Sequence, residues 1–239
     1  MRLYKHLVSI CCFLVLFNCN KEQKISFSDI NITADNNTIV DVNIPEAHGD
    51  KTVSNQINSE IQKAIISALH IGNPDEITSS SLEESITSFN NEYNGFKSDF
   101  PETAQLWEAQ IDGKVMYQSP EIISIAMTSY TNTGGAHGIL NISFLNFDSK
   151  TGQRIQNNQI FNDAEAFKTV AHPFFIDATK NKSLLIDYKQ FELPTNIGYS
   201  EEGIVLLYNT YEIAPYSSGI LELAIPFGDA EPYLVFNSF

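Results

Sequence analysis

Residues 106–147 read LWEAQIDGKVMYQSPEIISIAMTSYTNTGGAHGILNISFLNF, and this stretch decides the fold class. Its first part is expected to form a hairpin about Asp112-Gly113, a dipeptide typical of two-residue turns between antiparallel strands. Residues 121–131 and 139–147 are two further strands, the first with apolar side chains at alternate positions. The stretch therefore predicts consecutive strands of a mainly antiparallel sheet.

Helical spacing of apolar residues lies on both sides of these strands. Within residues 52–69 the apolar side chains recur every three or four positions, which places them on one helical face. A second helix opens at Ser81, which with Glu84 has the spacing of a capping box. A third helix begins near Asp163, and Pro173 is expected to kink or end it because proline lacks an amide donor.

Further strands complete the pattern. The run 39–44 alternates and is expected to stop at Pro45, and residues 204–208 and 220–225 are the last strands. Strands and helices are segregated along the chain, so the fold class is α+β, with a mainly antiparallel sheet and about three helices. The first helices have few strands of their own to cover them, so we expect a single shared core.

The N-terminus has the pattern of an export signal. Arg2 and Lys5 precede an apolar run of about a dozen residues, which is too short to span a bilayer comfortably. The run ends near Cys19, and polar residues follow. We therefore expect residues 1–18 to be a bacterial lipoprotein signal and Cys19 to be acylated, with residues 19–27 as a polar tether. The alternative is an uncleaved N-terminal anchor helix.

Lipid on Cys19 would hold the exported chain at a membrane of the bacterial envelope, in the periplasm or at the cell surface. Each buried methylene of an acyl chain contributes about 0.8 kcal/mol to membrane binding, so several chains together give stable anchoring. The membrane is therefore the first expected partner.

Composition excludes several classes of function. All three cysteines, Cys11, Cys12 and Cys19, lie in the leader, so the rest of the chain has no thiol nucleophile and no cysteine zinc site. The formal charge is −15, and it becomes −17 without Arg2 and Lys5, which disfavours nucleic acid as a partner. The G-x-S-x-G, H-E-x-x-H and P-loop signatures are absent.

The remaining histidines do not have metal-ligand spacing. None has a second potential ligand one helical turn away, so we expect no metal site and no cofactor. His70, at a helix end, and His172, before a proline, are expected to be structural. These histidines are His48, His70, His137 and His172.

Two segments are candidates for ligand binding. Residues 134–138, Gly-Gly-Ala-His-Gly, permit positive φ angles and close backbone approach, so they form either a ligand site or a tight strand connection. Residues 208–219 contain three tyrosines, which form either a recognition surface or a half-buried crossover. The candidate ligand-binding residues are Gly134, Gly135, His137, Gly138, Tyr211 and Tyr216.

Three segments of the second half together resemble a family of domains of unknown function. They are Thr133 to Gly138, Asp148 to Gly152, and Tyr208 to Gly219 with the following Ile225-Pro226. Domains of this family form the extracellular part of the RsiV-type lysozyme-sensing anti-sigma factors and accompany the catalytic domain of a peptidoglycan deacetylase. The resemblance covers residues 120–232, and the segment from Val42 to Asn58 resembles the companion domain that usually precedes it.

The resemblance implies an α+β ectodomain that works at the cell surface. In the RsiV-type relatives the domain binds lysozyme, a cationic protein, and in the deacetylase it is an accessory. The sequence shows no sigma-binding segment and no deacetylase domain, so neither activity is expected here. We expect an N-terminal α+β part at residues 28–105 and a C-terminal α+β domain at residues 106–239.

Two hypotheses for function follow. The first is a lipid-anchored envelope protein that binds a cationic protein such as lysozyme, or peptidoglycan. The second is an envelope hydrolase that acts on a wall component, with His137 as general base or metal ligand and a nearby carboxylate such as Glu121 or Glu212. Charge, anchor and resemblance favour binding over catalysis.

Overall fold

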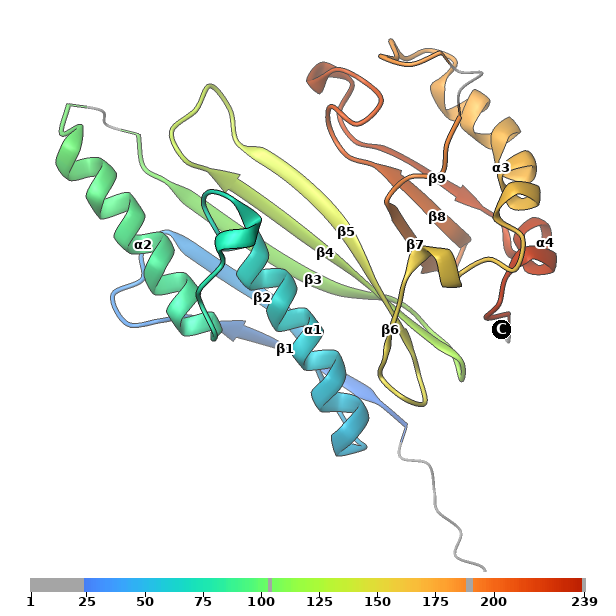
Figure 1. Ribbon diagram of the computed structural model, residues 1–239, viewed down its shortest axis with the longest axis horizontal. Helices are drawn as coiled ribbons and strands as arrows, with labels where there is room; N and C mark the ends of the chain where they lie inside the picture. The colour runs from blue at the N-terminus through green and yellow to red at the C-terminus, as the bar shows by residue number, and fades with distance from the viewer. Residues whose placement is uncertain (1–23, 103–104, 188–190, 238–239) are drawn as a thin grey trace, which may run out of the picture.

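The computed structural model describes residues 24–102, 105–187 and 191–237. Figure 1 shows a long sheet with two helices across one face, and a smaller sheet with its own helices on the other side. The predicted leader and Cys19 lie outside the described residues, so the lipoprotein signal stays a prediction.

The six strands of the large sheet lie in chain order. They are β1 (Ser26–Ile32), β2 (Val40–His48), β3 (Glu108–Gln118), β4 (Ile122–Asn132), β5 (Ile139–Asp148) and β6 (Arg154–Ile155). Neighbouring strands are antiparallel except β2 and β3, which run parallel because a long helical crossover joins them. The α+β class with a mainly antiparallel sheet is confirmed.

Two helices cover one face of this sheet: α1 (Lys51–Leu69) and α2 (Leu82–Asp99). α1 begins after Asp50, whose carboxylate accepts hydrogen bonds from the amides of Thr52 and Val53. α2 begins after Ser81, which accepts from the amide of Glu84 at 3.1 Å, as the sequence predicts. Both N-caps satisfy amides that have no partner inside the helix.

The core beneath these helices joins both halves of the chain. Ile57 and Ile61 of α1 are 0% and 1% exposed and belong to one cluster with Ile111 and Ile123 of β3 and β4. Full burial of a side chain of this size contributes roughly 1.5–3 kcal/mol. Residues before and after position 105 therefore share this core, while a second cluster forms around the smaller sheet.

The smaller sheet consists of β7 (Asn196–Ser200), β8 (Gly203–Tyr208) and β9 (Leu221–Ile225), all antiparallel. It packs with α3 (Ala164–Thr179) and α4 (Phe227–Ala230) around a second apolar cluster. Short 3-10 helices are η1 (Pro74–Glu76), η2 (Asn157–Gln159), η4 (Tyr216–Ser218) and η5 (Glu231–Tyr233). Phe144 of β5 contacts Val205 and Leu207 of β8, so the two sheets pack face to face.

The hairpin predicted at Asp112-Gly113 is wrong. β3 runs straight through both residues, and the turn to β4 comes after Gln118. A Cβ at Gly113 would lie 2.6 Å from Cδ of Pro45, so the glycine is required for the close approach of β2 rather than for a turn.

Contrary to expectation for Pro45, and to one of the two outcomes expected for Pro173, neither proline ends its element. Pro45 lies inside β2, at a point where pairing with β3 has already ended at Asn43, so its missing amide leaves that ladder intact. Pro173 lies inside α3 on the exposed side, while Ala171 and Phe175 on either side are buried and hold the helix together.

β1 was not predicted from the sequence. Ser26 and Phe27, at the end of the predicted tether, pair with His48 and Ala47 of β2. Phe27 also packs against the first core, which orders this part of the chain. In the described ranges no helix combines the length and hydropathy that crossing a bilayer requires.

Candidate functional site

The two candidate segments meet in space. The β4–β5 loop and the β8–β9 loop lie at the same end of the two sheets in Figure 1. The ring of His137 stacks on that of Tyr216, with centroids 3.9 Å apart and planes 17° apart. Tyr211 lies beside Tyr216 at a centroid distance of 5.8 Å. We call the two loops, with the rings of His137, Tyr211 and Tyr216 that they carry, the aromatic loop pair.

Backbone contacts set the shape of the β4–β5 loop. Gly134 has a φ of +89° and donates its amide to the side chain of Asn132 at 3.1 Å. A glycine adopts this conformation without a steric penalty. Gly135 is exposed, and Gly138 is buried because the ring of Tyr130 packs directly against it and leaves no room for a Cβ.

The β8–β9 loop is fixed to β5 by one side chain. The amide group of Asn209 accepts from the backbone N–H of Ile142 and donates to its carbonyl, both at 2.9 Å. A side chain thus takes the place of a neighbouring strand at the edge of β5. The backbone N–H of Asn209 donates to the carboxylate of Glu212 at 2.9 Å, which tightens the loop from within.

A further hydrogen bond joins the loops at their tips. The hydroxyl of Tyr216 donates to the carbonyl of Gly138 at 3.4 Å, and Nδ1 of His137 lies 3.2 Å from the same oxygen. The geometry therefore brings together His137, Gly138, Tyr211 and Tyr216. Gly134 and Gly135 shape the same loop without a contact to the tyrosines.

The surface around the aromatic loop pair is apolar and open to solvent. Tyr211 is 59% exposed and Tyr216 38% exposed, and the first residues of β5, Ile139 and Leu140, are 53% and 38% exposed. Aromatic and aliphatic side chains that gather in this way at loop tips are typical of protein–protein contact sites.

A histidine-based hydrolase would use a carboxylate beside His137. Glu212 is bonded to Asn209, and Glu121 lies at the opposite end of β4, about 30 Å along the strand. Within the described part of the chain, His137 has no ion pair and no hydrogen bond to a carboxylate. The same residues contain no cluster of histidine, cysteine, aspartate and glutamate that could hold a metal ion.

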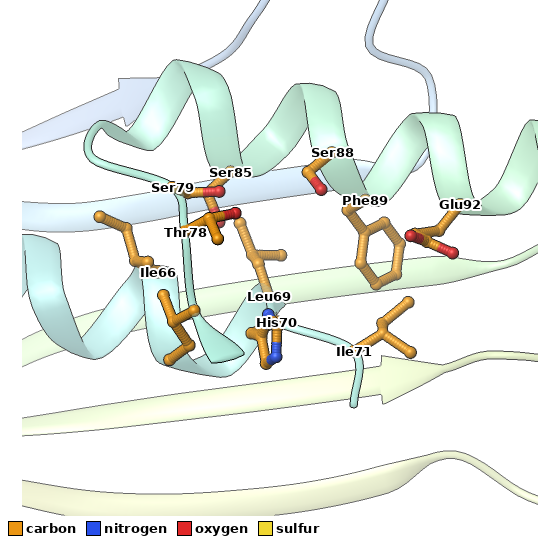
Figure 2. A pocket seen from close by; sticks show the side chains of 11 residues that line it. Ile66, Leu69, His70, Ile71, Thr78, Ser79, Ser85, Ser88, Phe89 and Glu92 are labelled. Atoms are coloured by element: carbon orange, nitrogen blue, oxygen red, sulfur yellow. The ribbon is translucent and has the colours of Figure 1, made fainter. Parts of the chain in front are cut away.

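Two hollows of the described surface lie elsewhere, beside α1 and the segment that leads into α2. The first, of about 140 Å³, has Ser88 and Glu92 on one side and His70 at the end of α1 on the other (Figure 2). It is smaller than the usual ligand pocket of roughly 300–1,000 Å³. The second, of about 330 Å³, shares Ile66 with it and is lined mainly by polar side chains of α1 and of the segment before α2. His70 bonds to the carbonyl of Asn73 at 2.9 Å, in agreement with a structural role.

One ionisable group lies at the base of the site. Burial raises the pKa of Tyr208 well above its ordinary value, and the nearby carboxylates of Glu212 and Glu192 raise it further. Its hydroxyl donates to the carbonyl of Glu192 at 2.5 Å. Tyr208 therefore stays neutral and anchors the end of β8 beneath the loop.

Sequence reasoning missed Asn209 and Tyr130, which position the two loops. Asn209 directly follows β8, where asparagine is common in turns, and this gives no hint of a partner on β5. Tyr130 appears in the sequence only as one more residue of a strand. Their roles depend on contacts between segments that are distant in sequence.

Two family models match the chain. Residues 32–140 match the model described as "Deacetylase PdaC", and residues 148–228 match the model described as "Protein of unknown function (DUF3298)". The suspected resemblance is thereby confirmed: a PdaC-like segment precedes a DUF3298-like segment. The two matches are separated by residues of β5, whereas the sequence prediction divides the halves at residue 105.

Solved structures share the fold. A DUF3298 family protein from Pseudomonas aeruginosa PAO1 is 20% identical with a TM-score of 0.59, over 91% of this chain and 96% of the other. A DUF3298 family member from Bacteroides fragilis NCTC 9343 is 20% identical with a TM-score of 0.57, over 90% and 94% of the two chains. Among curated proteins there is no match.

Proposed function

We propose that this protein is a binding module of the bacterial cell envelope, held at a membrane by lipid on Cys19, and that its aromatic loop pair contacts a cationic protein such as lysozyme. The observation that carries the proposal is the junction of the two loops. His137 and Tyr216 stack at 3.9 Å while Tyr211 stays 59% exposed.

The composition of the loop surface supports a protein ligand. Tyrosine is enriched among the residues that dominate binding energy in protein interfaces, because it buries a large ring at a low cost in side-chain entropy. Asn209 and the stacking of His137 hold Tyr216 in place before a partner arrives. Less ordering is then required on binding, which favours affinity.

Charge supports a cationic ligand. The chain has a formal charge of −15, so its field attracts basic proteins and speeds their association at low salt. The RsiV-type proteins that the second half resembles bind lysozyme, which is cationic. The first segment, residues 32–140, matches the model named "Deacetylase PdaC", which connects it with an enzyme family. Peptidoglycan is the alternative ligand.

A pull-down tests the proposal. Residues 24–239, which contain every side chain of the two large core clusters, are immobilised and exposed to lysozyme and to purified peptidoglycan, at low and high salt. We expect lysozyme to be retained at low salt and released at high salt, because ions screen the attraction. Retention of peptidoglycan alone would assign the module to the cell wall, and retention of neither would refute binding.

Paired variants locate the contact. Tyr211→Ala combined with Tyr216→Ala should reduce lysozyme retention at least about tenfold, since hot-spot residues contribute 2 kcal/mol or more. Val235→Ala is the matched control, because Val235 is 50% exposed and lies near the C-terminal end, next to Ile160. Equal binding by both variants would place the contact elsewhere on the molecule.

The hydrolase hypothesis has no comparable observation behind it. His137 is exposed and is engaged by Tyr216 and Gly138, while Glu121 lies at the far end of β4 and Glu212 accepts a hydrogen bond from the backbone of Asn209. Release of soluble fragments from peptidoglycan by the intact chain, lost in His137→Ala, is the result that would revive it.

A further inference from the structure

One face of the large sheet carries no helix, and only part of it, around Ala126, Ile142 and Phe144, packs against the smaller sheet. α1 and α2 pack on the face that contains Val42, Ile111 and Ile125, so the alternate residues of each strand point to the other side. The register places polar side chains there in two rows that cross the strands. We call these residues the polar sheet face: Asn31, Asn43, Asp112 and Thr128 in the first row, and Asp41, Gln110 and Tyr130 in the second.

The side chains of the polar sheet face are close and accessible. Side chains directly opposite one another on neighbouring strands have Cβ atoms about 4.5–5.5 Å apart. Asn31 donates to the carboxylate of Asp41 at 3.0 Å and to the amide oxygen of Asn43 at 2.9 Å. Each member is exposed or half-buried, so the remaining donors and acceptors face solvent.

The chemistry of this face differs from that of a protein interface. The centre of a stable protein interface is apolar and poor in charge. The rows contain amides, carboxylates, one hydroxyl and one tyrosine, with no aliphatic side chain before β5 is reached. Planar amides and carboxylates in rows suit a ligand that offers many hydroxyl groups, because each hydroxyl both donates and accepts.

The charged side chains on and beside the polar sheet face restrict the class of ligand further. Asp41 and Asp112 lie in adjacent rows, and on the same side of β3 Glu108 is the next position beyond Gln110 and Lys114 the next position beyond Asp112, so three carboxylates face one lysine. An anionic polymer is repelled by this arrangement, and an ammonium group is attracted. The second row ends at Tyr130, whose ring packs against Gly138 beside Tyr216. An aromatic ring there can stack on the apolar face of a sugar.

We propose that the polar sheet face binds a glycan chain that carries free amino groups. The carboxylates of Asp41 and Asp112 pair with ammonium groups, and the amides of Asn43 and Gln110 bond to hydroxyls. This site is separate from the protein contact at the aromatic loop pair, so either proposal stands if the other fails.

Calorimetric titration of the purified full-length chain tests the site. The probes are chitosan oligosaccharides, whose amines are free, and chitin oligosaccharides of the same length, whose amines are acetylated. We expect the chitosan chains to bind and salt to weaken them, with weaker binding of the chitin chains. No binding of chitosan, or equal binding of both probes at all salt concentrations, would overturn the proposal.

Variants assign the binding to this face. Asp41→Asn with Asp112→Asn should weaken chitosan binding by about two- to fivefold for each carboxylate, as expected for exposed ion pairs. Glu76→Gln with Glu83→Gln removes the same charge on the helix side and should leave binding unchanged. Gln110→Ala, an exposed change that preserves charge, should also weaken binding. If both charge pairs weaken binding equally, only the overall charge acts and the site is wrong.

Discussion

Replacing Asn209 with alanine removes the two hydrogen bonds that join the β8–β9 loop to the edge of β5. Both bonds, to the N–H and to the carbonyl of Ile142, are 2.9 Å long and partly buried. A neutral hydrogen bond contributes a net 0.5–1.5 kcal/mol or so, and thus the pair contributes about 1–3 kcal/mol to the free energy of unfolding. We expect Asn209→Ala to lose that amount.

Urea unfolding followed by circular dichroism measures the loss. Asn209→Asp should lose at least as much as Asn209→Ala, because its carboxylate still accepts from the N–H of Ile142 but places a second acceptor against the Ile142 carbonyl. Asn141→Ala, an exposed neighbour on β5, is the control and should change stability by less than about 0.5 kcal/mol.

Binding provides a second readout of the same substitution. Once the loop is released, Tyr216 must be ordered again on contact with a partner, so lysozyme retention should fall along with stability. If Asn209→Ala unfolds at the same urea concentration as wild type and binds equally well, Asn209 does not position the loop and this reasoning is refuted.

Three further substitutions test the fold and its pH dependence. Tyr199→Phe should leave stability unchanged or raise it, since the buried hydroxyl of Tyr199 has no hydrogen-bond partner among the described residues. Burial also raises the pKa of Tyr199, so wild type should lose stability above about pH 10. Thermal melts at rising pH should show a smaller loss for the variant. Gly203→Ala should abolish soluble expression or lower the melting temperature sharply, because φ is +141° and a Cβ would overlap the carbonyl of Ile225. Hydrogen bonds from the backbone and side chain of Ser80 hold the pKa of Glu84 below its ordinary value of 4.5. The stabilisation from Glu84 is therefore present above that pH and is lost as the pH falls through the lowered pKa. Glu84→Gln should flatten the acid side of the curve of stability against pH, and a curve identical to that of wild type would count against the cap.

Local sequence patterns predicted the long helices well, but they misassigned the roles of a glycine and a proline. The helices at Lys51–Leu69 and Leu82–Asp99 follow from apolar spacing and from capping side chains, which act within a few residues. Gly113 and Pro45 were misread because each has its meaning in the neighbouring strand. Gly113 makes room for Pro45, and Pro45 is tolerated because the hydrogen-bonded pairing of β2 with β3 has already ended at Asn43.

Prediction of the candidate site shows the same division. Both glycine- and tyrosine-rich segments are visible in the sequence, because unusual composition is a local property. Their contact is not visible, since it depends on how the small sheet packs on Phe144 of β5 and on one bond pair from Asn209. The exclusion of Glu121 as a partner of His137 likewise required the length of β4.

By itself, the sequence determined the fold class, the acidic charge and the two candidate segments, because periodicity, charge and short motifs are readable one segment at a time; lipid attachment at Cys19 stays a prediction. Only the tertiary structure decided that His137 lies on Tyr216, that Glu121 lies far from His137, and that the polar residues of β1 to β4 share one face. Strand order and register produce these contacts, and they join residues up to about a hundred positions apart, beyond the range of any local pattern.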